Sequence, residues 1–136
     1  MTQVKDVMSS NPTTCEPQAS VVDAAKVMAK EDVGPIPIVE GDRLVGLVTD
    51  RDLVMRVLAE GRDAGSTMVG EIASRDLVTV SPDDDLDRAL QLMAENQVRR
   101  LPVVESDSLV GIIAQRDIAL EGQDRETGQV VEQISR

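Results

Sequence analysis

Hydrophobic positions between residues 44 and 61 follow two periods in turn. In residues 44–48, two apolar residues stand on each side of Gly46, which is typical of a short strand covered on both faces. From Asp50 onward, apolar side chains recur at helical spacing: Leu53, Val54, Val57 and Leu58. This segment therefore predicts a strand that ends at Thr49, followed directly by a helix that has acidic residues in its first turn and ends at Gly61.

The same pattern returns 65 residues later without a gap, and residues 4–52 align with residues 69–117 in constant register. The pairs of identical residues include Val4 with Val69, Pro17 with Pro82, Ala24 with Ala89, Met28 with Met93, and Pro37 with Pro102. A register of this length indicates a duplicated unit. We expect one repeat over 1–62, a second over 66–122, and a tail over 123–136 that forms a short helix docked on the pair.

Each repeat predicts the element order β-α-β-β-α, led by a short helical turn. The first repeat has its turn at 4–8, strands at 13–15 and 36–39, and a helix capped by Ser20; the second has its turn at 69–73, strands at 77–80 and 101–104, and a helix capped by Asp85. Strand, helix and strand imply a parallel crossover, and the short turn that follows implies an antiparallel hairpin. A repeat of roughly 60 residues buries too little surface to be secure alone. We therefore expect an α/β (α+β) fold in which two units pack about a pseudo-two-fold axis.

The composition excludes several classes of site. The chain contains no His, Phe, Tyr or Trp, and Cys15 is its single cysteine. Imidazole acid-base chemistry, histidine ligands for a metal, an intrachain disulfide and aromatic stacking of bases are therefore excluded. We expect no enzyme activity and no metal site, and we interpret Cys15 as a core residue rather than a redox switch.

Charge and hydropathy bear on partners and location. The formal net charge of -11 argues against nucleic acid as a partner, because phosphate binding needs clustered Lys and Arg. No apolar run approaches the roughly 18 residues of a membrane span, and the first residues do not resemble a signal peptide. We therefore expect a cytoplasmic protein that binds neither nucleic acid nor membrane.

The repeats, with their apolar-Pro-apolar strands and the Gly-x-x-Thr-x-x-Asp end of the following strand, resemble a cystathionine β-synthase (CBS) domain pair. The sequence at 98–104, Val-Arg-Arg-Leu-Pro-Val-Val, is also familiar from such proteins. The chain is most similar to small stand-alone bacterial CBS-pair proteins of the stress and hypoxic responses, because no catalytic or channel domain accompanies the pair. The resemblance implies a non-catalytic regulatory module that senses an adenine nucleotide (AMP, ADP or ATP), or sometimes S-adenosylmethionine, in clefts between the repeats. It also implies a homodimer, a regulated protein partner and no required cofactor.

The resemblance assigns roles to particular residues. In the family, the Asp of the motif holds the ribose hydroxyls and the Thr holds phosphate, while basic residues ahead of the proline strand of the opposite repeat reach the phosphates. Carried over to this chain, Thr49 and Asp52 share one site with Arg99 and Arg100. This site has ligands for both the ribose and the phosphates, and we predict that it is competent.

The second site departs from the family pattern. Asp117 is retained, but Ala114 replaces the motif Thr, and Gly34 and Pro35 stand where the arginines would be. We predict that this site is weak or degenerate. The resemblance places further residues at the adenine pocket: Thr13, Pro35 and Ile36.

Each of these residues also has a purely structural interpretation. Thr-x-x-Asp at a helix start resembles a capping box, worth about 1 kcal/mol without any ligand. Arg99 and Arg100 are also consistent with solvated charges that balance carboxylates, and the residues of the expected adenine pocket with simple core packing. A second function therefore stays open, a dimeric interaction or scaffold module that has lost ligand binding, and Ala114 and Pro35 favour it.

Overall fold

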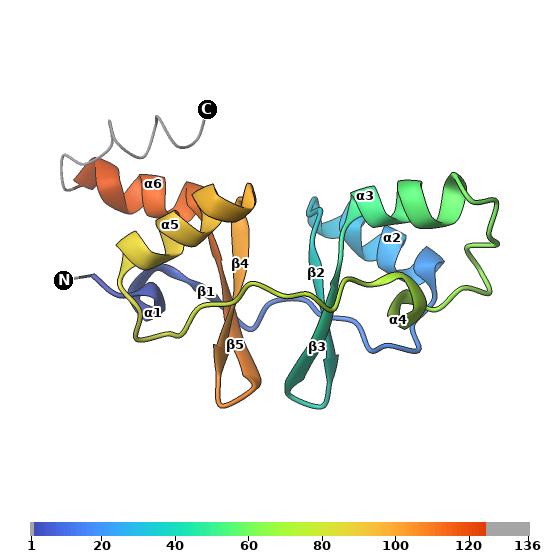
Figure 1. Ribbon diagram of the computed structural model, residues 1–136, viewed down its shortest axis with the longest axis horizontal. Helices are drawn as coiled ribbons and strands as arrows, with labels where there is room; N and C mark the ends of the chain where they lie inside the picture. Colours follow the sequence, from blue (N-terminus) through green and yellow to red (C-terminus); the bar gives the residue numbers. More distant parts are fainter. Residues whose placement is uncertain (1, 125–136) are drawn as a thin grey trace. The chain divides into compact units, whose positions relative to one another are not determined.

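The computed structural model describes residues 2–124, which form two compact units (Figure 1). Unit 2 is the continuous segment Thr13–Leu77, whereas unit 1 combines residues 2–12 with residues 78–124. Of the tail predicted over 123–136, the first two residues belong to a helix that ends at Asp124, and the rest lies outside the described residues.

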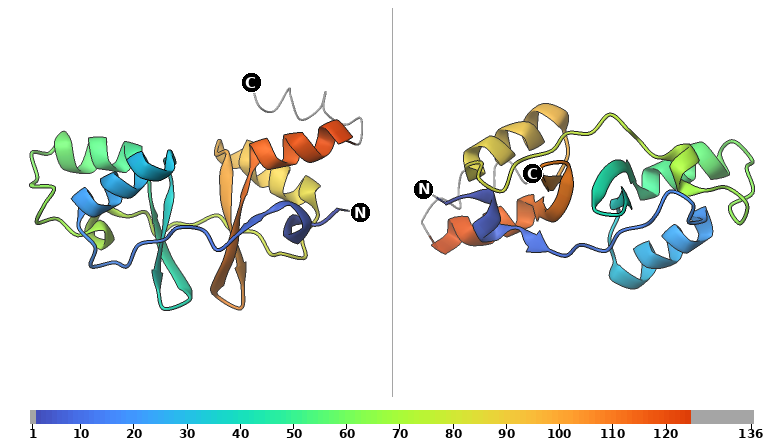
Figure 2. Two further views of the ribbon diagram at one scale, coloured as in Figure 1. Left: turned by 180° about the vertical axis from the view of Figure 1, so that it is seen from behind. Right: turned by 90° about the horizontal axis from the view of Figure 1, so that it is seen from below.

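Unit 2 contains an antiparallel hairpin whose tip points away from its helices (Figures 1 and 2). Its elements are α2 (Val21–Glu31), β2 (Ile36–Glu40), β3 (Arg43–Val48), α3 (Asp50–Leu53), the π-helix η1 (Val54–Leu58) that continues α3, and α4 (Val69–Ile72). Ile36 lies opposite Val48 in the hairpin, and Cys15 forms a parallel bridge to Ile38. The predicted hairpin and parallel crossover are thus confirmed, whereas the predicted strand at 13–15 is reduced to this bridge.

Unit 1 repeats the arrangement. Its elements are α1 (Val4–Val7), β1 (Ser9–Ser10), α5 (Leu86–Asn96), β4 (Arg100–Glu105), β5 (Ser108–Ala114) and α6 (Gln115–Asp124). β5 pairs antiparallel with both β4 and β1, and Val80 forms a parallel bridge to Val103. Each of these three pairings has a counterpart in unit 2, made by the residues at the equivalent positions of the other repeat. The duplicated sequence is therefore also a duplicated structure. The predicted strand at 77–80 is again reduced to a single bridge.

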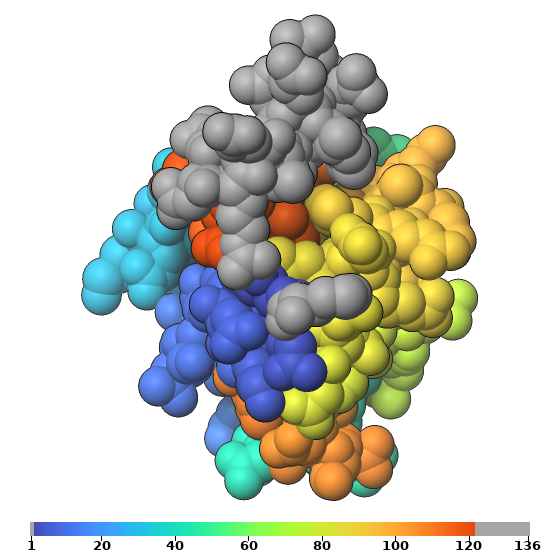
Figure 3. Space-filling model, turned by 90° about the vertical axis from the view of Figure 1, so that its left-hand side faces the viewer, coloured from blue at the N-terminus to red at the C-terminus, as the bar shows by residue number. Residues whose placement is uncertain are grey.

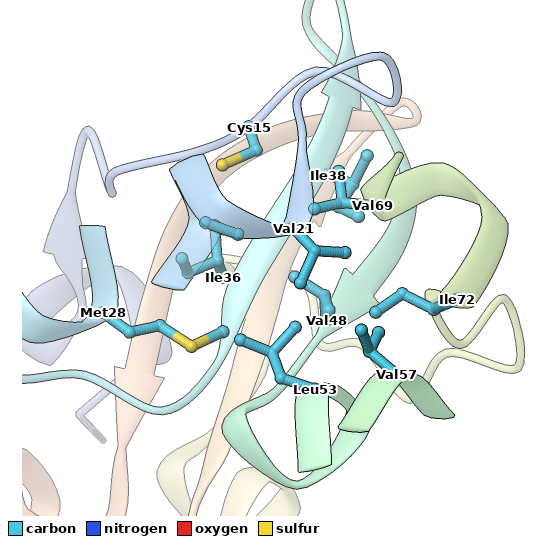
Figure 4. Close-up of a cluster of buried hydrophobic side chains, with 11 residues drawn as sticks. Cys15, Val21, Met28, Ile36, Ile38, Val48, Leu53, Val57, Val69 and Ile72 are labelled. Carbon is cyan, nitrogen blue, oxygen red and sulfur yellow. The ribbon is translucent and has the colours of Figure 1, made fainter. Parts of the chain in front are cut away.

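Each unit has its own hydrophobic core. The core of unit 2 consists of Cys15, Val21, Ala24, Met28, Ile36, Ile38, Val48, Leu53, Val57, Val69 and Ile72 (Figure 4). The core of unit 1 consists of Val4, Val80, Ala89, Met93, Leu101, Val103, Ile113 and Ile118. The apolar positions of α2 and α5 predicted from helical spacing, Ala24 with Met28 and Ala89 with Met93, are buried in these cores.

The two long helices begin differently. The Ser20 hydroxyl accepts the backbone N–H of Asp23 at 3.0 Å, which confirms the predicted cap of α2. Within residues 2–124, Asp85 stands at the predicted N-cap position of α5 but makes no side-chain cap bond, and the N–H of Leu86, the first helical residue, donates to the carbonyl of Thr2 at 3.3 Å.

The helix after β3 buries a narrower stripe than predicted. Leu53 and Val57 lie in the core, but Val54 and Leu58 are 52% and 68% exposed. The helix widens here to a π-turn, in which the N–H of Ala59 donates to the carbonyl of Val54 at 2.9 Å. Because a π-turn takes more residues than an α-turn, the spacing of an α-helix no longer describes a single face.

The short leading helix of each repeat packs in the unit formed mainly by the other repeat. In unit 2, α4 docks through the N–H of Val69, which donates to the carbonyl of Ala19 at 2.8 Å. In unit 1, α1 docks through the N–H of Val4, which donates to the carbonyl of Asp84 at 2.8 Å. Figure 3 shows this leading segment, in blue, against the yellow segment that precedes α5. The predicted repeats and the compact units therefore have different boundaries.

Gly46 and Gly111 lie where a leading segment crosses a strand. A β-carbon on Gly111 would lie 2.7 Å from both the sulfur of Met8 and the carbonyl oxygen of Ser9. A β-carbon on Gly46 would lie 3.3 Å from the β-carbon of Ala73 and 3.3 Å from the carbonyl oxygen of Ser74. The glycine of each motif is therefore needed for close approach of another backbone segment.

Gly111→Ala should lower the free energy of unfolding by about 1–3 kcal/mol, because the added methyl overlaps a backbone carbonyl that has little room to move. Urea denaturation followed by circular dichroism measures this. Gly46→Ala is the matched control, and it should cost less because its contacts are longer. Equal losses for the two variants would show that crowding by the leading segment is not the cause.

Candidate functional site

Thr49 and Asp52 bind each other at the start of α3. The N–H of Asp52 donates to the hydroxyl of Thr49 at 3.2 Å, and the N–H of Thr49 donates to Oδ2 of Asp52 at 2.9 Å. This reciprocal pair is a capping box, so the structural interpretation of the motif is realised. The box engages one carboxylate oxygen, and the hydroxyl of Thr49 acts in it as an acceptor. The proton of that hydroxyl and the second oxygen of Asp52 are not used by the box.

The second carboxylate oxygen of Asp52 faces an arginine. Nε of Arg56 lies 3.7 Å from Oδ1 of Asp52, and the aspartate side chain is 17% exposed. Nη1 of the same arginine donates to the carbonyl of Ile72 at 3.1 Å. Asp52 is thus a largely buried carboxylate beside a positive charge, able to accept hydrogen bonds from neighbouring hydroxyl groups.

The start of β2 lies next to this motif in unit 2. The N–H of Asp50 donates to the carbonyl of Gly34 at 3.2 Å, and Ile36 pairs with Val48 in the hairpin. Pro35 therefore lies between two residues, Gly34 and Ile36, that are bonded to the start of α3 and the end of β3 respectively, and its place at an adenine pocket stays a prediction. The side chain of Ile36 is fully buried in the core, so a ligand would meet its backbone instead.

Thr13 is exposed, and its hydroxyl donates to a carboxylate oxygen of Glu31 at 3.1 Å. Glu31 is the last residue of α2. The hydroxyl of Thr13 is therefore engaged at the end of this helix, and its predicted place at an adenine pocket stays a prediction.

The remaining predicted residues belong to unit 1. Arg100 lies opposite Ala114 in the β4–β5 hairpin, and the carbonyl of Arg99 accepts the N–H of Gln115 at 2.8 Å. Asp117 is partly buried in the first turn of α6. Both arginines thus start the strand beside the second motif. Their predicted grouping with Thr49 combines residues of different units and stays a prediction.

Sequence reasoning missed Arg56. The residue 65 positions later is Glu121, so the two repeats carry opposite charges one helical turn after their motif aspartates. Arg56 and Asp52 attract each other at this spacing, whereas Glu121 and Asp117 are both acidic. Alignment of the repeats contains this difference, but the hydrogen bond from Arg56 to Ile72 is visible only in the fold.

A small pocket in unit 2 is separate from these residues. Its volume is about 70 Å³, and it is lined by Pro17, Ile38, Glu40, Val45, Gly46, Gly70, Ala73 and Arg75. Ala73 leaves this space open, whereas the residue at the equivalent position of unit 1, Met8, places its sulfur against Gly111. Pockets that hold drug-sized ligands occupy about 300–1,000 Å³, so this one is too small for a nucleotide.

Cys15 is buried in the core of unit 2. Burial raises the pKa of its thiol above the ordinary value, and the negative charge of Asp23 raises it further. The thiol is therefore neutral near pH 7, and the reactive thiolate is disfavoured. This environment agrees with the interpretation of Cys15 as a core residue.

Residues 2–124 contain no group of three or more His, Cys, Asp or Glu side chains that could hold a metal ion. Over the same range, no helix is both long enough and apolar enough to cross a bilayer.

Comparison with protein families identifies both repeats. The model of the CBS domain matches residues 4–59 and residues 69–123. The chain belongs to the CBS domain family. The resemblance and the mixed α/β fold are thus confirmed, and the chain is a CBS domain pair, a module that is generally regulatory and non-catalytic.

Individual CBS proteins match almost end to end. The CBS domain-containing protein YhcV of Bacillus subtilis is 43% identical over 136 residues, which cover 99% of this chain and 96% of that protein. Hypoxic response protein 1 of Mycobacterium tuberculosis is 38% identical over 120 residues, which cover 88% of this chain and 84% of that protein. The chain is therefore similar to small proteins that consist mainly of a CBS pair.

Solved structures with bound ligands are similar as well. The CBS domain pair of protein MJ0100, in complex with 5′-methylthioadenosine and S-adenosyl-L-methionine, has a TM-score of 0.79 and 29% identity, and the match covers 92% of this chain and 98% of that chain. CBSX2 in complex with AMP has a TM-score of 0.80 and 25% identity, covering 93% of this chain and 99% of that chain. Each of these ligands contains an adenosine moiety.

Thr49→Ala should lower the free energy of unfolding by about 1 kcal/mol without any ligand, because it removes the hydroxyl that accepts the N–H of Asp52. Urea denaturation at pH 7 measures the change. Thr49→Ser keeps an acceptor at the same place and should stay close to the unsubstituted protein. An unchanged midpoint for Thr49→Ala would mean that the capping box does not stabilise the fold.

Proposed function

We propose that this CBS pair is a cytoplasmic, non-catalytic sensor of an adenine nucleotide of the AMP, ADP or ATP class, acting in a stress response through a regulated protein partner. It has one competent and one degenerate site and needs no resident cofactor. The observation that carries the proposal is the Asp52 carboxylate, which is largely buried and has one oxygen outside the capping box. The adenosine ligands of the similar structures support it, because each contains a ribose.

In the proposed site, Asp52 accepts hydrogen bonds from the ribose hydroxyls. A carboxylate offers several lone pairs, and the capping box uses only part of this capacity. Thr49 contributes its hydroxyl proton to a phosphate oxygen, because its oxygen already accepts the N–H of Asp52 and the proton is left to donate. The capping box and ligand binding are therefore compatible.

The second motif supports the degenerate site. Ala114 has no hydroxyl to offer to a phosphate, although Asp117 keeps the carboxylate. Glu121, one turn further along α6, adds a negative charge at the place where the first repeat has Arg56.

Arg99 and Arg100 are the proposed phosphate ligands of the competent site. A guanidinium binds phosphate oxygens with two parallel hydrogen bonds, and these adjacent arginines stand out in a chain with a formal net charge of -11. Arg100 is partly buried, which strengthens its interaction with an anion, whereas Arg99 is exposed. We therefore expect Arg100 to contribute more than Arg99.

Two observations support an alternative, a ligand-free dimeric scaffold. The capping box gives Thr49 and Asp52 a structural role that needs no ligand. The π-helix η1 also exposes an apolar group, Val54, Met55 and Leu58, each at least half exposed. Exposed apolar side chains that lie together on one helix can form a contact with another protein. We propose that a second copy of the chain covers it, whether or not a nucleotide binds.

A third possibility, an S-adenosylmethionine sensor, is supported by the ligand of MJ0100.

Nucleotide binding is tested first by ultraviolet absorption, because a chain without aromatic residues is almost transparent near 260 nm. A peak that follows the purified protein and is released by acid would reveal a retained adenine ligand. Calorimetry with AMP then tests exchangeable binding. Asp52→Asn should abolish it, because an amide replaces the carboxylate acceptors, and AMP at 100 times its Kd should stabilise only the unsubstituted protein, by about 2.7 kcal/mol.

Asp50→Asn is the control, since Asp50 is an exposed acid of the same helical turn that accepts the N–H of Arg51. This variant should bind AMP normally.

Arg100→Ala should weaken the binding of AMP far more than the binding of adenosine, and equal losses for the two ligands would contradict the phosphate role. Absence of binding by AMP, ADP and ATP together with binding of S-adenosylmethionine would support the third possibility. No binding of any of them would support the scaffold.

Leu58→Glu should dissociate the proposed homodimer, because it places a charge in the apolar cluster of η1. Analytical ultracentrifugation measures the mass in solution. Ala29→Glu adds the same charge at an exposed position of α2 and should leave the dimer intact. A dimer that survives Leu58→Glu would show that the contact lies elsewhere.

A further inference from the structure

Arg56 connects two elements of unit 2 that are distant in sequence, the start of α3 and the end of α4. Its Nε lies 3.7 Å from Oδ1 of Asp52, in the motif at the start of α3. Its Nη1 donates at 3.1 Å to the carbonyl of Ile72, the last residue of α4. Both contacts use one planar guanidinium group, whose nitrogen atoms keep a fixed geometry relative to each other. A displacement of the carboxylate therefore acts directly on the hydrogen bond at α4.

The end of α4 is a sensitive place for such a contact. The last carbonyl groups of a helix lack partners within the helix, so the bond from Arg56 satisfies an acceptor that the helix itself leaves open. Directly after α4, Ser74 exchanges two hydrogen bonds of 2.9 Å with Leu47 of β3. The chain then leaves unit 2 at Leu77. Arg56 thus holds the last element of unit 2 before the chain passes to unit 1.

We propose that Arg56 is a positioning residue that couples the state of Asp52 to the stability of α4 and the strand contact that follows it. The ligand part rests on the proposed function: hydroxyl groups bound to Asp52 fix its carboxylate, the carboxylate fixes Arg56, and Arg56 tightens α4. Such a coupling is reciprocal, so loosening α4 weakens the ligand by the same factor. The signal reaches the segment that joins the two units.

The second motif has no arginine at the position of Arg56. The equivalent of Arg56 is Glu121, and the equivalent of Ile72 is Val7. An ionised carboxylate accepts hydrogen bonds but does not donate them, so Glu121 cannot make the bond to a carbonyl that Arg56 makes. The repeat that keeps the complete Thr-x-x-Asp motif is therefore also the repeat in which an arginine donates to the last carbonyl of a leading helix.

Residue-resolved hydrogen exchange of the ligand-free protein tests the connection directly. The probes are the N–H of Ala73, which donates to Val69, and the N–H of Ser74, which donates to Leu47. Asp52→Asn keeps the size and capping ability of the side chain but removes its charge. It should speed exchange at both amides about fivefold, the loss expected for one hydrogen bond. Asp50→Asn is the control and should leave both rates unchanged.

Double variants separate the connection from general loosening. Arg56→Met should speed the same amides, and Asp52→Asn should add nothing further in its presence. Arg62 contacts α4 independently, through an ion pair of 3.1 Å with Glu71. Arg62→Met should therefore be additive with Asp52→Asn. Unchanged exchange in Asp52→Asn, or additivity with Arg56→Met, would overturn the proposal.

AMP at saturating concentration supplies the second measurement. It should slow exchange at Ala73 and Ser74 in the unsubstituted protein, and this slowing should be lost in Arg56→Met even where AMP still binds. Slowing that persists in Arg56→Met would overturn the ligand coupling. If AMP does not bind the unsubstituted protein, the proposed function fails, and the ligand-free variants alone decide whether Asp52 acts on α4 through Arg56.

Discussion

The close approach of a leading segment to a glycine of the neighbouring strand is the constraint on which the rest of this structure depends. A β-carbon on Gly111 would overlap the carbonyl of Ser9, and one on Gly46 would lie tightly against Ala73 and Ser74, because the leading segment of a repeat crosses the strand at each place. The same segments supply Val4, Val69 and Ile72 to the cores. Neither unit can complete its core from one repeat alone. The motif glycine therefore serves assembly, while the Thr and Asp that follow it occupy the candidate site.

In the proposed site, one pair of residues stabilises the fold and also keeps groups that a ligand could use. Thr49 and Asp52 begin a helix for each other, yet one carboxylate oxygen and one hydroxyl proton remain outside that arrangement. Arg56 adds a favourable charge and extends the site to a second element. A ligand that binds here acts on groups that already hold the fold together. Binding and local stability are for this reason parts of the same energy balance.

Much of the fold could be predicted because apolar spacing and a constant register are local properties of the sequence. The hairpins, the parallel crossovers and the buried faces of α2 and α5 follow from them. The sequence could not predict which unit α1 and α4 each join. Val4 and Val69 occupy the same position of the repeat, so each helix could pack equally well in its own repeat or in the other one. The π-turn at Val54 and the bond from Arg56 to the Ile72 carbonyl depend on tertiary contacts that no periodicity encodes. Among the site residues, Thr49 and Asp52 were found from the motif, and Arg56 was not.

The different make-up of the units has a consequence for synthesis on the ribosome. Unit 2 is a continuous segment, so all of its parts are available once residue 77 has emerged. Unit 1 needs the first residues of the chain together with residues 78–124, and its contact between Val4 and Asp84 spans most of the sequence. Contacts of this separation close late and slowly. The first segment to be synthesised is therefore among the last to pack. Unit 2, which carries the complete motif, is expected to fold before unit 1.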